Sequence, residues 1–252
     1  MKDLVTLWKH TRMVVLVALT AAVYAAILIP FKIAIPLIPG FTEVRPANVI
    51  PVICSLLFGP AAAWGAAFGN LAGDIYGGTL SPGSAFGFVG NFLYGYVPYK
   101  LWAQRWRRSA EPEPDMKSVR QVVEYAAGAI LASAACALII AWGVNALGLV
   151  PFAVLGPIIL VNNAAVAIIL GPPLLRILYP RVRRWGLLYR DVMPVDDLSR
   201  GRFALIGVFL LMVGAIGGLM QGTYTAATFP EASLTLITAP LVAAMLIAAA
   251  LL

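Results

Sequence analysis

The chain has 252 residues, of which 61% are apolar and only 12% charged, and its mean hydropathy of +0.89 excludes a soluble globular domain. Its net charge of +7 comes from basic residues that fall between the apolar runs, not among aromatic residues on an exposed element. The basicity therefore indicates membrane topology, so we expect a lipid bilayer around the chain and no nucleic-acid partner.

The apolar runs predict membrane-spanning helices. A hydrocarbon core roughly 30 Å thick needs about 20 apolar residues per helix. Runs that meet or approach this length cover residues 13–30, 84–102, 126–150, 152–178, 203–220 and 234–252. The stretch 47–76 fits either one broken span or two short helices that turn at Gly59 and Pro60.

The basic residues decide between these two topologies. With two short helices and the N-terminus inside, 16 of the 18 basic residues lie on the cytoplasmic side, and only Lys32 and Arg45 lie outside. A single span would place the loop from Arg105 to Arg120 outside, opposite the other basic clusters. We therefore predict eight helices in the cell membrane, with both termini cytoplasmic.

This arrangement divides the chain into three parts. Residues 1–180 form a core of six helices, residues 181–202 a basic cytoplasmic linker, and residues 203–252 an additional transmembrane hairpin of two helices. The predicted fold class is thus an all-α, polytopic membrane helix bundle. The sequence contains no visible internal repeat, which argues against an inverted-repeat transporter.

The residues needed for catalysis are missing from the predicted membrane region. The only histidine, His10, precedes the first helix, so neither a His-based metal site nor a Ser/His/Asp triad can form within the membrane. Cys54 and Cys136 lie in predicted helices and act as small apolar residues there. No phosphate-binding GxxxxGK[ST] loop occurs. We expect no enzymatic activity, no metal and no cofactor.

A polar cluster is predicted at the outer ends of the helices. Six residues are candidate substrate-binding residues: Glu43, Arg45 and Asn48 in the loop before residue 49, Asn70 and Asp74 one turn apart, and Asn91. Asn91 lies about 12 Å below the outer end of its helix at 1.5 Å per residue. Polar side chains at this depth are costly unless they face a cavity or one another. They favour an outward-opening pocket. Each also has a structural explanation by itself: Glu43 and Arg45 can pair at the interface, Asp74 can end its helix, and Asn91 can hydrogen-bond between helices.

Further polar residues are second candidates. Asn145, Gln221 and Tyr224 lie toward the outer ends of their predicted helices, and Asn162 and Asn163 fall near mid-membrane. For the last two, interhelical hydrogen bonding explains the amides as well as substrate contact does.

Small residues recur at helical spacing on two segments. Gly65, Gly69, Gly73 and Gly77 form a groove that lets another backbone approach closely. In the first long helix, Ala18, Ala22 and Ala26 form a stripe, with Ala21 and Ala25 beside it. Packing within the chain and docking onto another membrane subunit both fit the alanine stripe.

The run RPANVIPVICSLLFGPAAAWGAAFGNLAGDIYGG, from Arg45 to Gly78, resembles the second and third helices of the substrate-binding S components of energy-coupling factor (ECF) transporters. Shared features are an apolar helix, a Gly-Pro turn, a small-residue helix and a Gly-Asp near its outer end. The following segment GSAFGFVGNFLYGYVPYKLW is similar to the fourth helix of these proteins.

The resemblance implies a six-helix subunit that captures a vitamin, a related precursor or a metal ion from outside. The Glu/Arg/Asn/Asp cluster suits a small polar nutrient, and the His-rich set expected for nickel or cobalt is missing. It also implies three partners, namely a transmembrane scaffold subunit and two cytoplasmic ATPase subunits. The five alanines would meet the scaffold, and the loop from Phe41 to Asn48 would close the pocket. The helices after Arg202 lie outside the six-helix pattern. Two other functions remain open, an ion-coupled secondary transporter that uses Asp74 or Glu43, and a non-transporting membrane scaffold or assembly protein.

Overall fold

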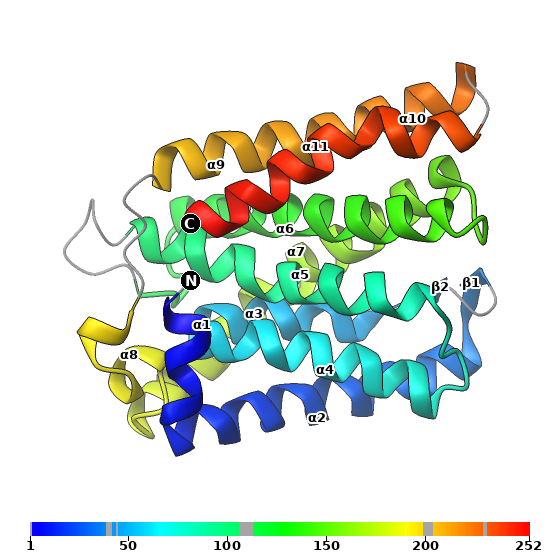
Figure 1. The fold of residues 1–252 in the computed structure, drawn as a ribbon. Coiled ribbons are helices and arrows are strands. Elements are labelled where there is room, and N and C mark those ends of the chain that lie inside the picture. Colours follow the sequence, from blue (N-terminus) through cyan, green and yellow to red (C-terminus); the bar gives the residue numbers. More distant parts are fainter. Residues whose placement is uncertain (1, 39–41, 44, 106–112, 199–203, 229–230) are drawn as a thin grey trace.

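The protein is a bundle of helices that lie side by side (Figure 1), seen in a computed structural model that describes residues 2–38, 42–43, 45–105, 113–198, 204–228 and 231–252. The first half contains α1 (Lys2–Thr6), η1 (Leu7–Lys9), α2 (Thr11–Ala34), β1 (Pro36–Ile38), β2 (Thr42–Glu43), η2 (Pro46–Asn48), α3 (Val49–Phe58), α4 (Pro60–Tyr76) and α5 (Gly83–Arg105). The second half contains α6 (Val119–Ala146), α7 (Phe152–Arg184), α8 (Tyr189–Val192), η3 (Val195–Asp197), α9 (Ala204–Met212), η4 (Val213–Gly217), α10 (Gly218–Thr228) and α11 (Glu231–Leu251).

The predicted all-α polytopic membrane fold is confirmed. Within the described residues, five segments are long and apolar enough to cross a membrane: Thr11–Lys32, Val119–Ala146, Phe152–Val192, Leu205–Ala226 and Ser233–Leu251. α1, α8 and both termini lie at one end of the bundle, and β1 and β2 lie at the other (Figure 1). We call these the termini end and the hairpin end.

The segment that could be one span or two consists of two short helices, as predicted. Gly59 ends α3 with a φ of 55°, and Pro60 begins α4. A Cβ at Gly59 would also lie 2.7 Å from Cγ of Tyr189, so both backbone conformation and space require glycine. All ten residues of α3 are buried. Neighbouring helices therefore shield α3 from lipid, so its length does not have to match the thickness of the bilayer.

The glycines of α4 receive a helix of the same chain, α2. Gly65 faces Thr20, Gly69 faces Tyr24, Gly73 faces Leu28 and Gly77 faces Lys32. A Cβ at Gly69 would lie 2.9 Å from the backbone oxygen of Ala21, so the two backbones approach too closely for a side chain. The matched spacing of four residues fixes the register of α2 against α4. It also decides which side chains of α2 point into the bundle.

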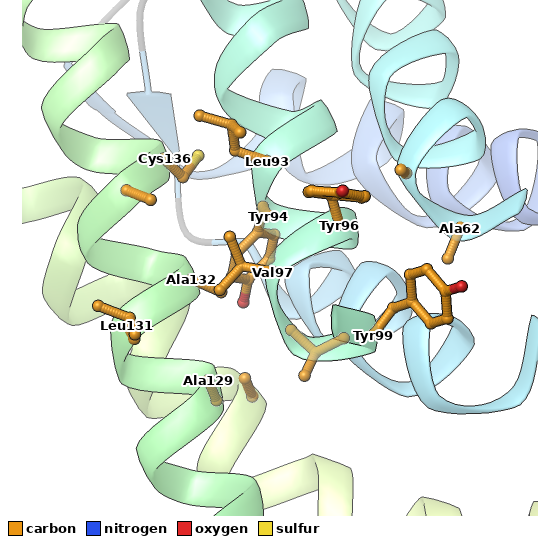
Figure 2. Packing of buried hydrophobic residues seen from close by; sticks show 14 of the residues in the cluster. Ala62, Leu93, Tyr94, Tyr96, Val97, Tyr99, Ala129, Leu131, Ala132 and Cys136 are labelled. Carbon is orange, nitrogen blue, oxygen red and sulfur yellow. The ribbon is translucent and has the colours of Figure 1, made fainter. Parts of the chain in front are cut away.

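α5 lies in the centre of the buried core. Figure 2 shows its tyrosine side chains between Ala132 of α6 on one side and Ala62 of α4 on the other. Tyr94, Tyr96 and Tyr99 are all buried. Because lipid provides no hydrophobic drive for helix association, this close packing of rings against alanines holds the helices together.

The additional hairpin, which contains α9, η4, α10 and α11, packs on α6 and α7, on the side of the bundle opposite α2 (Figure 1). A Cβ at Gly218 would lie 2.7 Å from Leu138, and one at Gly222 would lie 2.4 Å from Phe152, so α10 sits directly on both helices. α10 is preceded by the π-helical turn η4. The hairpin is therefore an integral layer of the described bundle.

α7 extends further than the sequence indicates. It runs to Arg184, so residues 181–184 of the predicted linker are helical. Arg181, Arg183 and Arg184 lie in its last turn, where positive charge is favourable at the negative end of the helix dipole. The short elements α8 and η3 follow.

The termini end of the bundle is closed by a buried ion pair. Nζ of Lys100 lies 2.8 Å from Oδ2 of Asp3, and both side chains are buried. The Tyr99 hydroxyl donates to the same carboxylate oxygen at 2.7 Å. Nearby, Nε2 of His10 lies 3.0 Å from Oδ2 of Asp197, which ties the start of α2 to η3. α1 therefore packs into this end of the bundle instead of extending away from it.

Candidate functional site

A cavity lies below β2 at the hairpin end, with an empty volume of about 540 Å³ that includes space open to solvent. Its polar wall consists of Thr42, Arg45, Asn70, Asp74, Thr79, Ser81, Ser84 and Asn163. The rest of the lining is Gly83, Gly87, Cys136, Ile140, Val144, Leu155 and Ile159. Small-molecule sites combine apolar walls with convergent polar groups, and polar residues make up a large share of this lining.

The loop that the sequence places above the pocket contains a short β-hairpin, which was not predicted. Pro36 pairs with Glu43 and Ile38 with Thr42 in an antiparallel register with an irregularity between the pairs. Two strands this short have little sequence signal, and their pairing depends on the anchored ends of the loop. The backbone of Glu43 belongs to β2, but its side chain lies outside the described residues.

Three predicted site residues form one hydrogen-bonded chain along the cavity wall. Nη1 of Arg45 donates to Oδ1 of Asn70 at 3.2 Å, and Nδ2 of Asn70 lies 3.4 Å from Oδ2 of Asp74. The backbone N–H of Arg45 also approaches Oδ1 of Asn162 at 3.4 Å. Asn70 thus bridges a cation and an anion, and the wall presents donors and acceptors to a ligand.

Lys32 completes the charged part of the site. Its ammonium group donates to Oδ1 of Asp74 and, at 2.8 Å, to Oγ1 of Thr79. A Cβ at Gly77 would lie 3.0 Å from Cδ of Lys32, so the glycine makes room for the lysine stem. Lys32 and Asp74 are both buried. Burial of a charge is tolerated when it is paired and hydrogen-bonded, as here.

A second polar network lies beneath the cavity. The Tyr24 hydroxyl is 2.8 Å from Oδ1 of Asn48 and 3.0 Å from Oδ1 of Asn91. Asn48 donates through Nδ2 to Oδ1 of Asn163, and the Tyr94 hydroxyl donates to the backbone oxygen of Asn163 at 3.1 Å. Only Asn163 of these five residues lines the cavity. The network therefore forms its floor and joins α2, η2, α5 and α7.

The structure thus divides the six candidate residues. Arg45, Asn70 and Asp74 line the cavity, and Asn48 and Asn91 lie in its floor. Sequence reasoning missed the roles of Lys32, Thr79 and Tyr24. One signal was available, because Tyr24 and Lys32 share the four-residue spacing of the α4 glycines and so occupy the same face of α2.

The alanine stripe lies on the opposite face of α2. Ala18, Ala22 and Ala26 are exposed, Ala21 is half-buried and Ala25 is buried. Intramolecular packing therefore does not cover the three residues of the stripe within the described chain.

A family model described as QueT transporter matches residues 14–180, from the start of α2 to near the end of α7. The chain belongs to the QueT transporter family. The family is a known type of ECF S component, for a queuosine precursor, so the resemblance found in the sequence is confirmed. No curated protein and no solved structure matches the chain.

Membership in the QueT family establishes the general class of the protein. It is a multi-pass membrane protein and a non-enzymatic, substrate-binding component of a transporter. The matched region includes every described residue that lines the cavity. It ends before α9, so the additional hairpin lies outside the part of the chain that the QueT family describes.

Proposed function

We propose that this QueT-family protein captures a queuosine precursor in the cavity at the hairpin end and delivers it as the S component of an ECF importer. The observation that carries the proposal is the wall formed by Arg45, Asn70 and Asp74, which offers both donors and acceptors in one cavity. The proposed orientation places this end outside and the basic termini end in the cytoplasm.

The polar wall suits the guanine-like base of a queuosine precursor. Such a base offers a carbonyl acceptor beside N–H donors on one edge. Arginine is a common partner of the guanine carbonyl, and a carboxylate accepts from adjacent N–H groups. Arg45 and Asp74 supply these two groups, and Ile140 and Leu155 supply apolar contact.

The closed termini end favours a capture subunit over a self-sufficient secondary transporter. A secondary transporter has to open a path from its site to the other side of the membrane. Here the floor network lies beneath the cavity, and the pair between Asp3 and Lys100 closes the far end of the bundle. If partner subunits bring about the release of the substrate, neither the floor network nor the pair between Asp3 and Lys100 has to break.

Ligand binding tests the proposed substrate class. Purified protein in detergent is titrated with 7-aminomethyl-7-deazaguanine, 7-cyano-7-deazaguanine, guanine and riboflavin. We expect a deazaguanine at 100 times its Kd to stabilise the fold by about 2.7 kcal/mol. Arg45→Gln should weaken binding about tenfold or more, because a hydrogen bond to a charged group contributes about 1.5–3 kcal/mol.

Lys117→Gln, which removes an exposed charge from the loop before α6, should bind like the wild type. The proposed substrate class is wrong if no deazaguanine stabilises the wild type. Uptake into vesicles that contain this chain alone, driven by an ion gradient, would instead establish the secondary-transporter alternative.

We further propose that the exposed face of α2, marked by Ala18, Ala22 and Ala26, docks onto the transmembrane scaffold subunit. The scaffold in turn connects the chain to two cytoplasmic ATPases. The opposite side of the bundle is covered by α10 and α11, which leaves the α2 side accessible (Figure 1). Small residues allow close helix approach within lipid.

Ala22→Trp should abolish co-purification with the scaffold and ATPase subunits and leave the Kd for the precursor unchanged. Ala243→Trp is the matched control, because Ala243 is an exposed alanine of α11. Equal loss of assembly in both variants, or in neither, would contradict docking through α2.

A further inference from the structure

α6 is shared between the cavity and the additional hairpin. Cys136, Ile140 and Val144 follow one another at intervals of four and line the cavity. On the back of the same helix, Leu138 meets Gly218 of α10. One helix therefore forms a wall of the site on one face and a packing surface for the hairpin on the other.

α7 also contacts both the cavity and the hairpin. Leu155, Ile159 and Asn163 line the cavity. Phe152 lies against Gly222 of α10, and a Cβ at Gly156 would lie 3.3 Å from Leu219. The hairpin thus packs against both helices that close this side of the cavity, and none of its described residues lines the cavity.

Asn145 joins these elements at the hairpin end. Its Oδ1 accepts from the backbone N–H of Phe152, the first residue of α7, at 3.0 Å. Its Nδ2 lies 3.4 Å from Oγ1 of Thr235 on α11. One helical turn away on α6, the Trp142 indole N–H donates to the backbone oxygen of the same threonine at 3.0 Å. Asn145 is only 7% exposed and its bond to Phe152 is buried, whereas the two bonds to Thr235 are partly buried.

The position of this junction links it to the shape of the cavity. Asn145 follows the lining residue Val144 directly, and Phe152 precedes the lining residue Leu155 by less than one turn. A displacement of the loop between α6 and α7 would move both lining residues. The bond from Asn145 to Thr235 fixes the start of that loop to α11, and the bond from Phe152 to Asn145 fixes the start of α7 to the same residue.

We propose that Asn145 is a positioning residue for substrate binding, and that the additional hairpin acts through it as a brace for the α6–α7 wall. This rests on the proposed function, since it takes the cavity as the substrate site. The hairpin therefore takes part in substrate capture without touching the substrate. Substitutions at its contact with Asn145 should weaken binding from outside the site.

The test compares Kd values for the deazaguanine that the wild type binds. Asn145→Ala should raise the Kd about tenfold, the equivalent of roughly 1.4 kcal/mol. Thr235→Val, which removes the hydroxyl at nearly constant volume, should raise it by a factor of about three to five, consistent with one neutral hydrogen bond of roughly 1 kcal/mol. Thr235→Ser keeps the hydroxyl and should restore the wild-type Kd.

Thr238→Val is the matched control on α11. Its hydroxyl is buried and donates to the backbone oxygen of Leu234 within the same helix at 2.8 Å. We expect its Kd to equal that of the wild type. Because Thr235 lies outside the cavity, a higher Kd for Thr235→Val alone supports the brace. A wild-type Kd in both Asn145→Ala and Thr235→Val overturns it, as does an equal loss in all variants including Thr238→Val.

Hydrogen exchange separates this inference from the proposed function, because it needs no ligand. The amide of Phe152 should exchange faster in Asn145→Ala than in the wild type, while amides in the centre of α6 stay protected. Unchanged exchange at Phe152 overturns the positioning role. Faster exchange in a protein that binds no deazaguanine leaves the brace standing and rejects the proposed substrate class instead.

Discussion

Asp74→Ala should abolish precursor binding and destabilise the protein by about 3–5 kcal/mol. The variant removes the acceptor from the cavity wall and leaves Lys32 as a buried cation that has lost its carboxylate partner. Breaking a buried ion pair by removing one partner typically has a cost of this size. Thermal unfolding in detergent measures the stability, and calorimetric titration with the deazaguanine measures the binding.

The double variant Lys32→Met/Asp74→Leu separates these two effects. Replacing both partners of a buried pair by apolar residues is often neutral for stability, so this protein should regain most of the lost stability. It should still fail to bind the precursor, because the carboxylate remains absent. As a surface control, Arg120→Ala breaks an exposed pair with Glu124 and should change stability by less than about 1 kcal/mol. Retained binding in either Asp74 variant would remove Asp74 from the site.

Gly69→Leu should lower both stability and substrate affinity. A Cβ at this position would lie 2.9 Å from the backbone oxygen of Ala21 and from Cδ1 of Tyr24, so α2 has to move away from α4. Overpacking of this kind typically costs about 1–3 kcal/mol. Tyr24 would move with α2 and release Asn48 and Asn91 from the floor of the cavity.

The matched control for this prediction is Gly217→Ala, since a Cβ at Gly217 meets nothing within 4 Å. It should retain the wild-type Tm and Kd, whereas Gly69→Leu should show a lower Tm and a higher Kd. A Gly69→Leu protein with wild-type values would show that α2 can separate from α4 without disturbing the site. In that case the register between the two helices would not position Tyr24.

The two small-residue features of the sequence, the glycines of α4 and the alanines of α2, face different surroundings. The groove of α4 is filled by α2 within the chain, and the register extends from Thr20 to Lys32. The exposed alanines lie on the other face of α2, where they are free of the described bundle. One helix therefore organises the site with one face and offers its other face to the proposed scaffold partner.

The sequence by itself determined the class of the protein and most of its helices. Apolar runs long enough for a bilayer predict helices because an unpaired backbone is too costly in lipid. The additional hairpin was predicted in this way, whereas the distribution of basic residues predicted the two short helices that turn at Gly59 and Pro60, and both features are present. The motif between Arg45 and Gly78 indicated the S-component family, and the family match confirms it.

Only the tertiary structure decided which polar residues share a site. Asn70 and Asp74 are one turn apart, so their proximity follows from helix geometry alone. Their partners Lys32 and Arg45 come from α2 and the loop after β2, and their approach depends on how the helices pack. The same holds for Asn163 of α7, which lines the cavity and accepts from Asn48. In the sequence, Asn48 and Asn91 cannot be distinguished from the residues that line the cavity. In the structure, the register of α2 brings the Tyr24 hydroxyl within hydrogen-bonding distance of both, and the three residues form the floor. Hydropathy and spacing describe each helix separately, whereas the site is formed by contacts between helices, and these depend on the close packing that the glycines of α4 allow.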